Sequence, residues 1–163
     1  MEIRRARPAD AAAIAEVHVR TWQAAYDHIF AAERLATIDV DARARLWEGW
    51  LTAGETAFVA EDAGRVVAFA WIGAAREVPG AGELYAIYAI PEAWGSNAGT
   101  ELMREACAAL RDAGFREAIL WVLDDNPRAR RFYEREGWAA DDTRREIEHL
   151  GARTEEVRYR IIL

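Results

Sequence analysis

Apolar residues along the chain follow two kinds of pattern, which predict helices and strands in alternation. Four segments predict helices: residues 14–25, 40–50, 100–112 and 128–135. Six runs rich in β-branched and aromatic residues predict strands: residues 2–5, 56–61, 66–72, 83–90, 117–123 and 157–163. The sequence from Trp138 onward is compatible with one more strand. We therefore expect an α/β (α+β) fold in a single domain over residues 1–163, with one central mixed sheet and helices on both of its faces.

The most informative stretch is residues 83–102, where a predicted strand leads through a glycine-containing turn into a helix. The first turn of a helix has free backbone N–H groups and the positive end of the helix dipole, so it binds phosphate without a charged side chain. Gly95 and Gly99 let the backbone approach an anion where a Cβ would intrude. We expect a pyrophosphate site on the amides of residues 95–100, although an ordinary strand-to-helix turn would look the same. A Walker loop is excluded because the chain has no lysine.

A second informative stretch, residues 126–138, reads NPRARRFYEREGW. Ala129, Phe132 and Tyr133 share helical spacing, so one face of the predicted helix is aromatic. A thiol pKa near ~8.5 lies below the ~10 of a phenol, so the Tyr133 hydroxyl is able to stabilise a leaving thiolate and give it a proton. The alternative is that Phe132 and Tyr133 are simply core residues.

Together and in this order, the two stretches resemble the GNAT superfamily of N-acetyltransferases. The later segment of that family commonly reads Asn-x-x-Ala-x-x-Phe-Tyr-x-x-x-Gly-Phe/Trp. The chain matches it throughout, at Asn126, Ala129, Phe132, Tyr133, Gly137 and Trp138. The family's acetyl-CoA loop, Gln/Arg-x-x-Gly-x-Gly/Ala after a strand, is matched at Gly99 but not at Trp94 or Asn97. Residues 21–26 also resemble a frequent version of the family's first helix, which borders the acceptor site.

The resemblance implies a mostly antiparallel sheet and an acetyl-CoA-dependent N-acetyltransferase. It implies that the backbone of residues 87–89 holds the pantetheine arm and thioester, and that an N–H there polarises the carbonyl and steadies the oxyanion. Asn126 would hold the CoA arm, and Tyr133 would be the general acid. The implied CoA-binding residues are Ile87, Tyr88, Ala89, Trp94, Gly95, Ser96, Asn97, Ala98, Gly99, Thr100, Asn126 and Phe132. If position 97 needs a positive φ, Asn tolerates it better than most residues. If the pyrophosphate instead needs close approach of the backbone, Asn97 would weaken CoA binding; we expect binding to survive.

The acceptor amine must lose a proton before it attacks, because a lysine-like amine has a pKa near ~10.4. Glu83 is the candidate base: it begins a predicted strand six residues before Ala89, and in the similar histone-acetylating branch a Glu at this offset acts as the base. A surface Glu at a strand edge is the alternative. Candidates to line the acceptor cleft, by ring contacts or as a proton relay, are His18, Trp22, Tyr26 and His28. The alternative is that these residues belong to the core of the first helix and that the histidines are simply solvated.

The charge balance argues against nucleic acid as a partner. The 21 basic residues are all arginine and stand against 28 acidic residues, which gives a net charge of −7. An acidic surface disfavours non-specific binding to nucleic acid and mildly favours a cationic substrate, although it is also what an ordinary acidic protein presents. The charged run at residues 144–148 is expected to be a solvated face.

The single cysteine and the absence of targeting signals favour a cytoplasmic protein. Cys107 excludes a disulfide framework and, among alanines, is expected to pack in a helix face rather than react. The histidines form no metal-ligand pattern with it, so no metal is expected. No apolar run suits a signal peptide or the ~20 residues of a membrane helix, so we expect no membrane partner. A terminal strand at residues 157–163 is able to pair across a homodimer.

Two other functions stay open on the sequence. One is an acyl-CoA-binding sensor or regulatory domain without catalysis; Tyr133 argues against it, and the departures in the acetyl-CoA loop leave it open. The other is an acyltransferase with a different acyl-CoA, which the size of the cleft around Trp71, Tyr85 and Tyr88 would decide. The acceptor is expected to be a small-molecule or peptide amine, with amino acids, antibiotics and protein N-termini all open.

Overall fold

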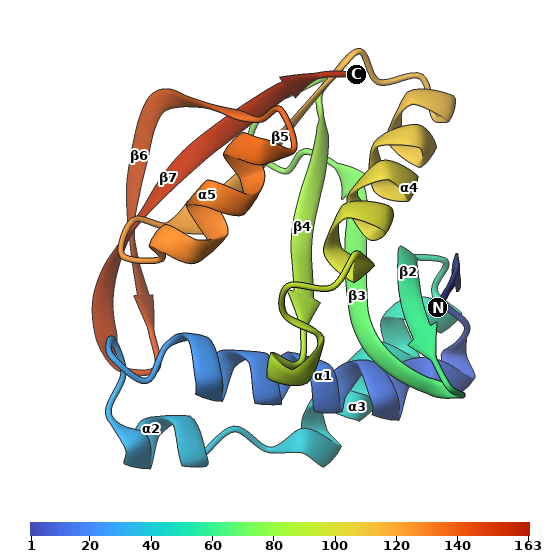
Figure 1. The fold of residues 1–163 in the computed structure, drawn as a ribbon. Helices are drawn as coiled ribbons and strands as arrows, with labels where there is room; N and C mark the ends of the chain where they lie inside the picture. The colour runs from blue at the N-terminus through green and yellow to red at the C-terminus, as the bar shows by residue number, and fades with distance from the viewer.

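One seven-stranded sheet runs through the computed structural model, which describes residues 1–163 (Figure 1). The strands are β1 (Glu2–Arg5), β2 (Thr56–Asp62), β3 (Arg65–Ala74), β4 (Gly82–Ala89), β5 (Glu117–Leu123), β6 (Ala139–His149) and β7 (Ala152–Ile162). Their order in the sheet is β1-β2-β3-β4-β5-β7-β6. Every neighbouring pair is antiparallel except β4 and β5. The expected mixed, mostly antiparallel sheet is confirmed.

Helices cover both faces of this sheet (Figure 1). They are α1 (Ala11–Ala25), α2 (Ala32–Ala36), α3 (Val40–Thr52), α4 (Ala98–Asp112) and α5 (Pro127–Arg135), with short 3-10 turns η1 (Pro8–Asp10) and η2 (Pro91–Ala93). The helices α1 and α3 pack on one face, and α4 and α5 lie on the other. No helix is both long and apolar enough to cross a membrane. The helices expected on both faces are therefore confirmed, and α2 is an addition.

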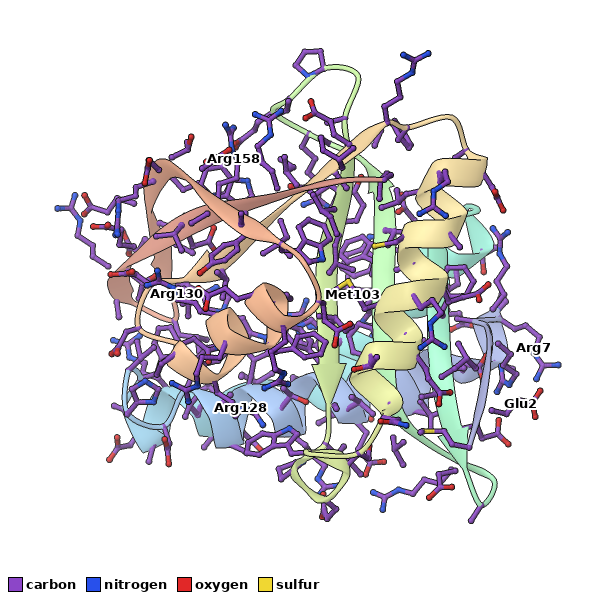
Figure 2. All side chains as sticks on the ribbon, turned by 45° about the horizontal axis from the view of Figure 1, so that its top comes forward. Glu2, Arg7, Met103, Arg128, Arg130 and Arg158 are labelled. Carbon is purple, nitrogen blue, oxygen red and sulfur yellow. The ribbon has the colours of Figure 1, made fainter.

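The β6–β7 hairpin is longer than the sequence pattern indicates. The charged run at residues 144–148 lies within β6, where no residue is buried, and β7 begins five residues before the expected position 157. Charged side chains pair across the two strands: Arg145 binds Glu156 at 2.7 Å and Arg158 binds Asp141 at 2.6 Å. Figure 2 shows Arg158 beside these strands. An exposed edge strand held by ion pairs carries no hydrophobic period to detect.

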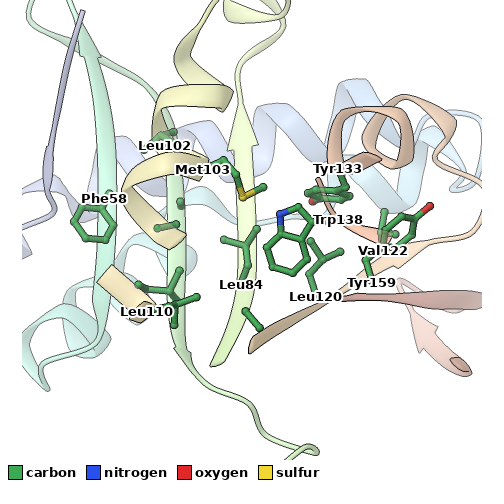
Figure 3. Packing of buried hydrophobic residues seen from close by; sticks show 14 of the residues in the cluster. Phe58, Leu84, Leu102, Met103, Leu110, Leu120, Val122, Tyr133, Trp138 and Tyr159 are labelled. Carbon is green, nitrogen blue, oxygen red and sulfur yellow. The ribbon is translucent and has the colours of Figure 1, made fainter. Parts of the chain in front are cut away.

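The larger core lies between the sheet and α4 and α5, and Trp138 occupies its centre (Figure 3). Trp138 comes three residues after the end of α5, is 2% exposed, and lies between Leu84 of β4 and Leu120 of β5 in the close view. The tryptophan that ends the predicted motif therefore joins the two strands on this face. Cys107 packs against the same core from α4, and burial raises the pKa of its thiol, as expected of a packing residue.

The sheet opens in its middle, between β4 and β5. Only Gly82 with Ala118 and Glu83 with Ile119 are paired, and the two strands diverge beyond Glu83. A β-bulge lies next to this point: Trp71 pairs with Ala86 and Ile72 with Leu84, which leaves Tyr85 as an extra residue in β4. A wedge therefore opens inside the sheet, with the last residues of β4 on one side and those of β5 on the other.

Candidate active site

The wedge between β4 and β5 continues as a cleft of about 950 Å³, near the upper end of the ~300–1,000 Å³ usual for ligand pockets. It runs from the N-terminus of α4 and one face of α5 to the loop between β3 and β4. The predicted site residues that line it are Trp22, Tyr26, Glu83, Ile87, Tyr88, Ala89, Trp94, Gly95, Ser96, Asn97, Gly99, Thr100, Asn126, Phe132 and Tyr133. Ala98 is fully buried in the core beneath them, and His28 lies elsewhere.

Backbone groups of β4 are unpaired along the wedge. The Ile90 amide donates to the Val67 carbonyl at 3.0 Å, and the alternation of an antiparallel ladder turns the Ile87 and Ala89 amides the other way, toward β5. Since β5 has diverged there, these two N–H groups have no strand partner. The Ala89 carbonyl accepts hydrogen bonds from Thr21 Oγ1 at 2.9 Å and from Trp94 Nε1 at 2.8 Å. The unpaired amides are hydrogen-bond donors for an extended ligand.

The turn before α4 has the geometry of an anion site. Gly95 adopts the positive φ, +81°, whereas Asn97 is helical at −76°, so the tolerance of Asn for a positive φ is not used here. Asn97 makes no side-chain cap, and the Gly99 and Thr100 amides have no partner in the chain. A Cβ on Gly99 would lie 3.2 Å from the Phe132 ring, so glycine lets the start of α4 approach α5 closely.

Three arginines of α5 line the same end of the cleft: Arg128, Arg131 and Arg135. The Arg128 guanidinium lies 3.3 Å from the centroid of the Trp94 ring and has no carboxylate partner. Partial burial there lowers the pKa of Arg128. Arg130, by contrast, turns away and binds Asp124 at 2.6 Å, and Figure 2 shows it toward the β6–β7 side. Sequence reasoning missed the three cationic positions, whose spacing of three and four residues marks one helix face.

Tyr133 and Asn126 lie between this end and the middle of the cleft. Tyr133 is 7% exposed and makes no hydrogen bond within the chain, and burial raises the pKa of its phenol well above the ordinary value. The phenol therefore stays protonated and available as a donor. Asn126 accepts a hydrogen bond from the Ala129 amide at 3.2 Å as the cap of α5, and donates to the Tyr26 hydroxyl at 3.3 Å. Burial raises the pKa of Tyr26 to about 12.

Glu83 stands where β4 and β5 separate. It is 6% exposed, and its Oε2 atom is buried without a hydrogen-bond partner. Burial raises the pKa of the Glu83 carboxyl, while the backbone amide and charge of Arg76 and the charge of Arg145 oppose the rise. A buried carboxyl with one oxygen left without a partner has a raised affinity for a proton and is suited to proton transfer.

Aromatic rings surround Glu83 at the far end of the cleft. Trp71, Tyr85 and Trp121 line this end, whereas Trp22 of α1 and Tyr26, which follows α1, line the cleft nearer to Ala89 and Asn126. The Nε1 atom of Trp121 is buried without a partner. This end therefore combines aromatic rings with charged side chains, among them Glu83, Arg76 and Arg145.

The two histidines of the predicted acceptor cleft lie outside it. His18 packs in the core, with its ring centroid 5.9 Å from that of Phe69, and burial lowers its pKa to about 3, so it is neutral. His28 is exposed and hydrogen-bonds the Asp125 carbonyl at 2.9 Å. His149, which sequence reasoning left aside, lies against Trp22 at 4.4 Å between ring centroids. No group of three or more His, Cys, Asp or Glu side chains gathers as a metal site.

The sequence and the fold of this chain are similar to those of known acetyltransferases. The sequence model of the Acetyltransferase (GNAT) family matches residues 13–138. An uncharacterized N-acetyltransferase of Bacillus subtilis (strain 168) is 34% identical over 128 residues, which are 77% of this chain and 73% of that protein. Two solved structures share the fold. The PaiA N-acetyltransferase of Thermoplasma acidophilum, in complex with coenzyme A, has a TM-score of 0.78 at 18% identity over the whole of both chains. A YncA acetyltransferase structure from Salmonella typhimurium, with acetyl-CoA, has a TM-score of 0.75 at 23% identity and covers 99% of this chain and 93% of that one.

Proposed function

Because the chain belongs to the Acetyltransferase (GNAT) family, we propose that it transfers the acetyl group of acetyl-CoA to a primary amine by direct attack in a ternary complex. The observation that carries this proposal is the wedge between β4 and β5. Its two ends differ in chemistry: unpaired amides and arginines lie at one end, and Glu83 among aromatic rings lies at the other. Tyr133 stands between them, so one cleft offers sites for donor and acceptor.

The donor end fits the charge and shape of coenzyme A. The free amides at the start of α4 and the unpaired guanidinium of Arg128 suit a diphosphate, which needs donors and positive charge together. The Ile87 and Ala89 amides suit the extended pantetheine arm and the acyl carbonyl. Acetyl-CoA supplies an activated acetyl thioester, and the chain holds and orients it.

At the acceptor end, Glu83 takes a proton from the incoming ammonium, directly or through water. Its raised pKa lies closer to that of an amine than an ordinary carboxyl pKa does, which helps proton transfer near neutral pH. As the amine nitrogen bonds to the acyl carbon, the bond from that carbon to sulfur breaks. The Tyr133 hydroxyl donates a hydrogen bond to the departing sulfur. The second proton of the attacking nitrogen is relayed through this hydroxyl to the thiolate, so the phenol ends protonated and coenzyme A leaves as a thiol.

Calorimetric titration with acetyl-CoA, and separately with an adenine dinucleotide, tests the donor half of the proposal. We expect micromolar binding of acetyl-CoA and none of the dinucleotide. A thiol-release assay with a panel of primary amines then tests transfer. Absence of acetyl-CoA binding would remove the proposal, and binding without turnover on any amine would favour a sensor domain instead.

A further inference from the structure

Arg76 lies at the acceptor end of the cleft with its charge unpaired. It follows β3 in the loop to β4, and its side chain lines the cleft. The guanidinium carbon is 4.3 Å from the centroid of the Tyr85 ring and 5.3 Å from that of Trp71. It forms no ion pair with any carboxylate. The two rings hold the cation in place by cation–π contact, and no carboxylate occupies its N–H donors.

The Tyr85 ring beneath Arg76 is itself fixed by three features of the fold. The bulge in β4 places Tyr85 outside the strand pairing. Its hydroxyl donates a hydrogen bond to the Ala74 carbonyl. A Cβ on Gly73 would come 2.6 Å from that hydroxyl oxygen, so only glycine leaves room for the ring. The platform under the guanidinium is therefore built into β3 and β4.

Arg145 is a useful contrast within the same cleft. Its guanidinium lies 4.1 Å from the centroid of the Trp121 ring, but it also binds Glu77 at 2.9 Å and Glu156 at 2.7 Å. Its charge is therefore compensated by neighbours. Glu77 and Glu156 are in turn paired with Arg145. At the acceptor end this leaves one cation without an ion pair, Arg76, and one carboxyl without an ion pair, Glu83.

We propose that the acceptor is an amino carboxylate, bound through its carboxylate by Arg76, with its amine at Glu83 and an apolar remainder against the rings. This rests on the proposed acetyl transfer. Gly73, three residues before Arg76, pairs with Glu83, and both Arg76 and Glu83 line the cleft, so the two groups are placed to bind one small molecule. Guanidinium and carboxylate match in a bidentate geometry, which a molecule with an amine alone does not offer. Trp71, Tyr85 and Trp121 suit an aliphatic or aromatic side chain.

The test compares each acceptor with the same molecule lacking its carboxylate. Apolar and aromatic L-amino acids are paired with their decarboxylated amines, phenylalanine with phenethylamine among them, and kcat/KM is measured by thiol release. For wild type we expect higher kcat/KM for the amino acids. In Arg76→Gln the ratio of amino acid to amine should fall about tenfold or more, and Arg76→Lys should keep part of it. The intrinsic reactivity of each amine, and any change in the Glu83 pKa, cancel when the ratios of two variants are compared.

Arg104→Gln is the matched control, since it removes an exposed arginine of α4 that does not line the cleft. Its ratio should equal that of wild type. An unchanged ratio in Arg76→Gln, wild-type preference for the amines, or turnover of carboxyl-amidated peptides alone would overturn the carboxylate inference and leave acetyl transfer standing. Acetyl-CoA binding without acetylation of any amino acid in the panel would overturn it as well. Absence of acetyl-CoA binding would overturn both proposals.

Discussion

Replacing Arg128 by glutamine tests whether α5 provides the positive charge that the loop before α4 lacks. The family's loop commonly has Gln or Arg where this chain has Trp94, and the Arg128 guanidinium lies on that very ring, 3.3 Å from its centroid. No carboxylate competes for it, so the charge is available to an anion. In Arg128→Gln the amide cannot replace either the charge or the planar fork of donors.

The expected loss follows from the bonds removed. Hydrogen bonds to charged groups contribute about 1.5–3 kcal/mol each, which corresponds to about 10- to 150-fold in affinity. Because the Arg128 residue is exposed on one side, solvent screening places the expected loss in the lower part of that range. The Kd for acetyl-CoA should therefore rise about 10- to 50-fold at low salt, and the difference from wild type should shrink as the salt concentration rises.

Calorimetric titration of both proteins with acetyl-CoA and with its 3′-dephospho analogue gives this difference directly. If Arg128 binds the diphosphate, the substitution lowers the affinity for the two ligands by the same factor. In steady state the change should appear in KM for acetyl-CoA, with kcat nearly unchanged, as for an interaction that is equal in the ground and transition states. Arg104→Gln removes the same charge from outside the cleft and should bind like wild type. An affinity of Arg128→Gln within twofold of wild type, in a folded protein, would refute the reasoning.

The remaining predictions concern buried groups around the wedge. Tyr133→Phe should lose about 100- to 10,000-fold in kcat while its calorimetric Kd for acetyl-CoA stays unchanged; unchanged turnover would remove the phenol from the mechanism. Glu83→Gln should lose kcat, and wild-type kcat/KM should fall as pH drops through the raised pKa of Glu83. A carboxyl whose pKa is raised by folding stabilises the protein fully below its unfolded value of about 4.3, and this contribution is lost as pH rises through the folded value. Thermal unfolding should therefore show Glu83→Gln more stable than wild type at pH 7, with the gap closing near pH 4; a gap independent of pH would contradict this. Trp138→Ala should lower the free energy of unfolding by about 3–5 kcal/mol, measured by urea denaturation, and a loss below 1 kcal/mol would mean that the ring does not join the two strands.

Local sequence was sufficient for most elements and for the residues that its motifs contain. The strand at residues 117–123 and the helix ending at Arg135 are bounded as expected, because their turns carry Asp, Asn, Pro and Gly. The two strands of the β6–β7 hairpin were expected, but its full length was not, since the ion pairs of its outer part join residues on different strands and leave no apolar period there. The position of Glu83 at the vertex of the wedge depends on where a parallel pairing ends, which no local pattern encodes. The assignment of Glu83 as base remains a prediction.

The arginines of α5 were not predicted as site residues, for another reason. Helical spacing at Ala129, Phe132 and Tyr133 marks the aromatic face, and Arg128 is adjacent to it in projection. Only the tertiary approach of α5 to the start of α4, permitted by Gly99, puts that cation beside the unpaired amides. The same approach brings Trp94 under Arg128, so the departure from the family's loop and the arginine across the cleft are two parts of one local arrangement.

The short pairing between β4 and β5 also has a consequence for motion. Central strands of a sheet are usually the slowest to exchange amide hydrogen for deuterium, because their opening requires large-scale unfolding. Here two registered pairs join the halves of the sheet, and the Ile87 and Ala89 amides already face the wedge without a strand partner. In the free protein we therefore expect fast amide exchange at Ile87 and Ala89, within a sheet whose other central amides exchange slowly. A ligand bound in the wedge should slow exchange at these two amides more than at any other. Because the β4–β5 pairing stops after two residue pairs, the Ile87 and Ala89 amides are already exposed to the wedge before any ligand binds.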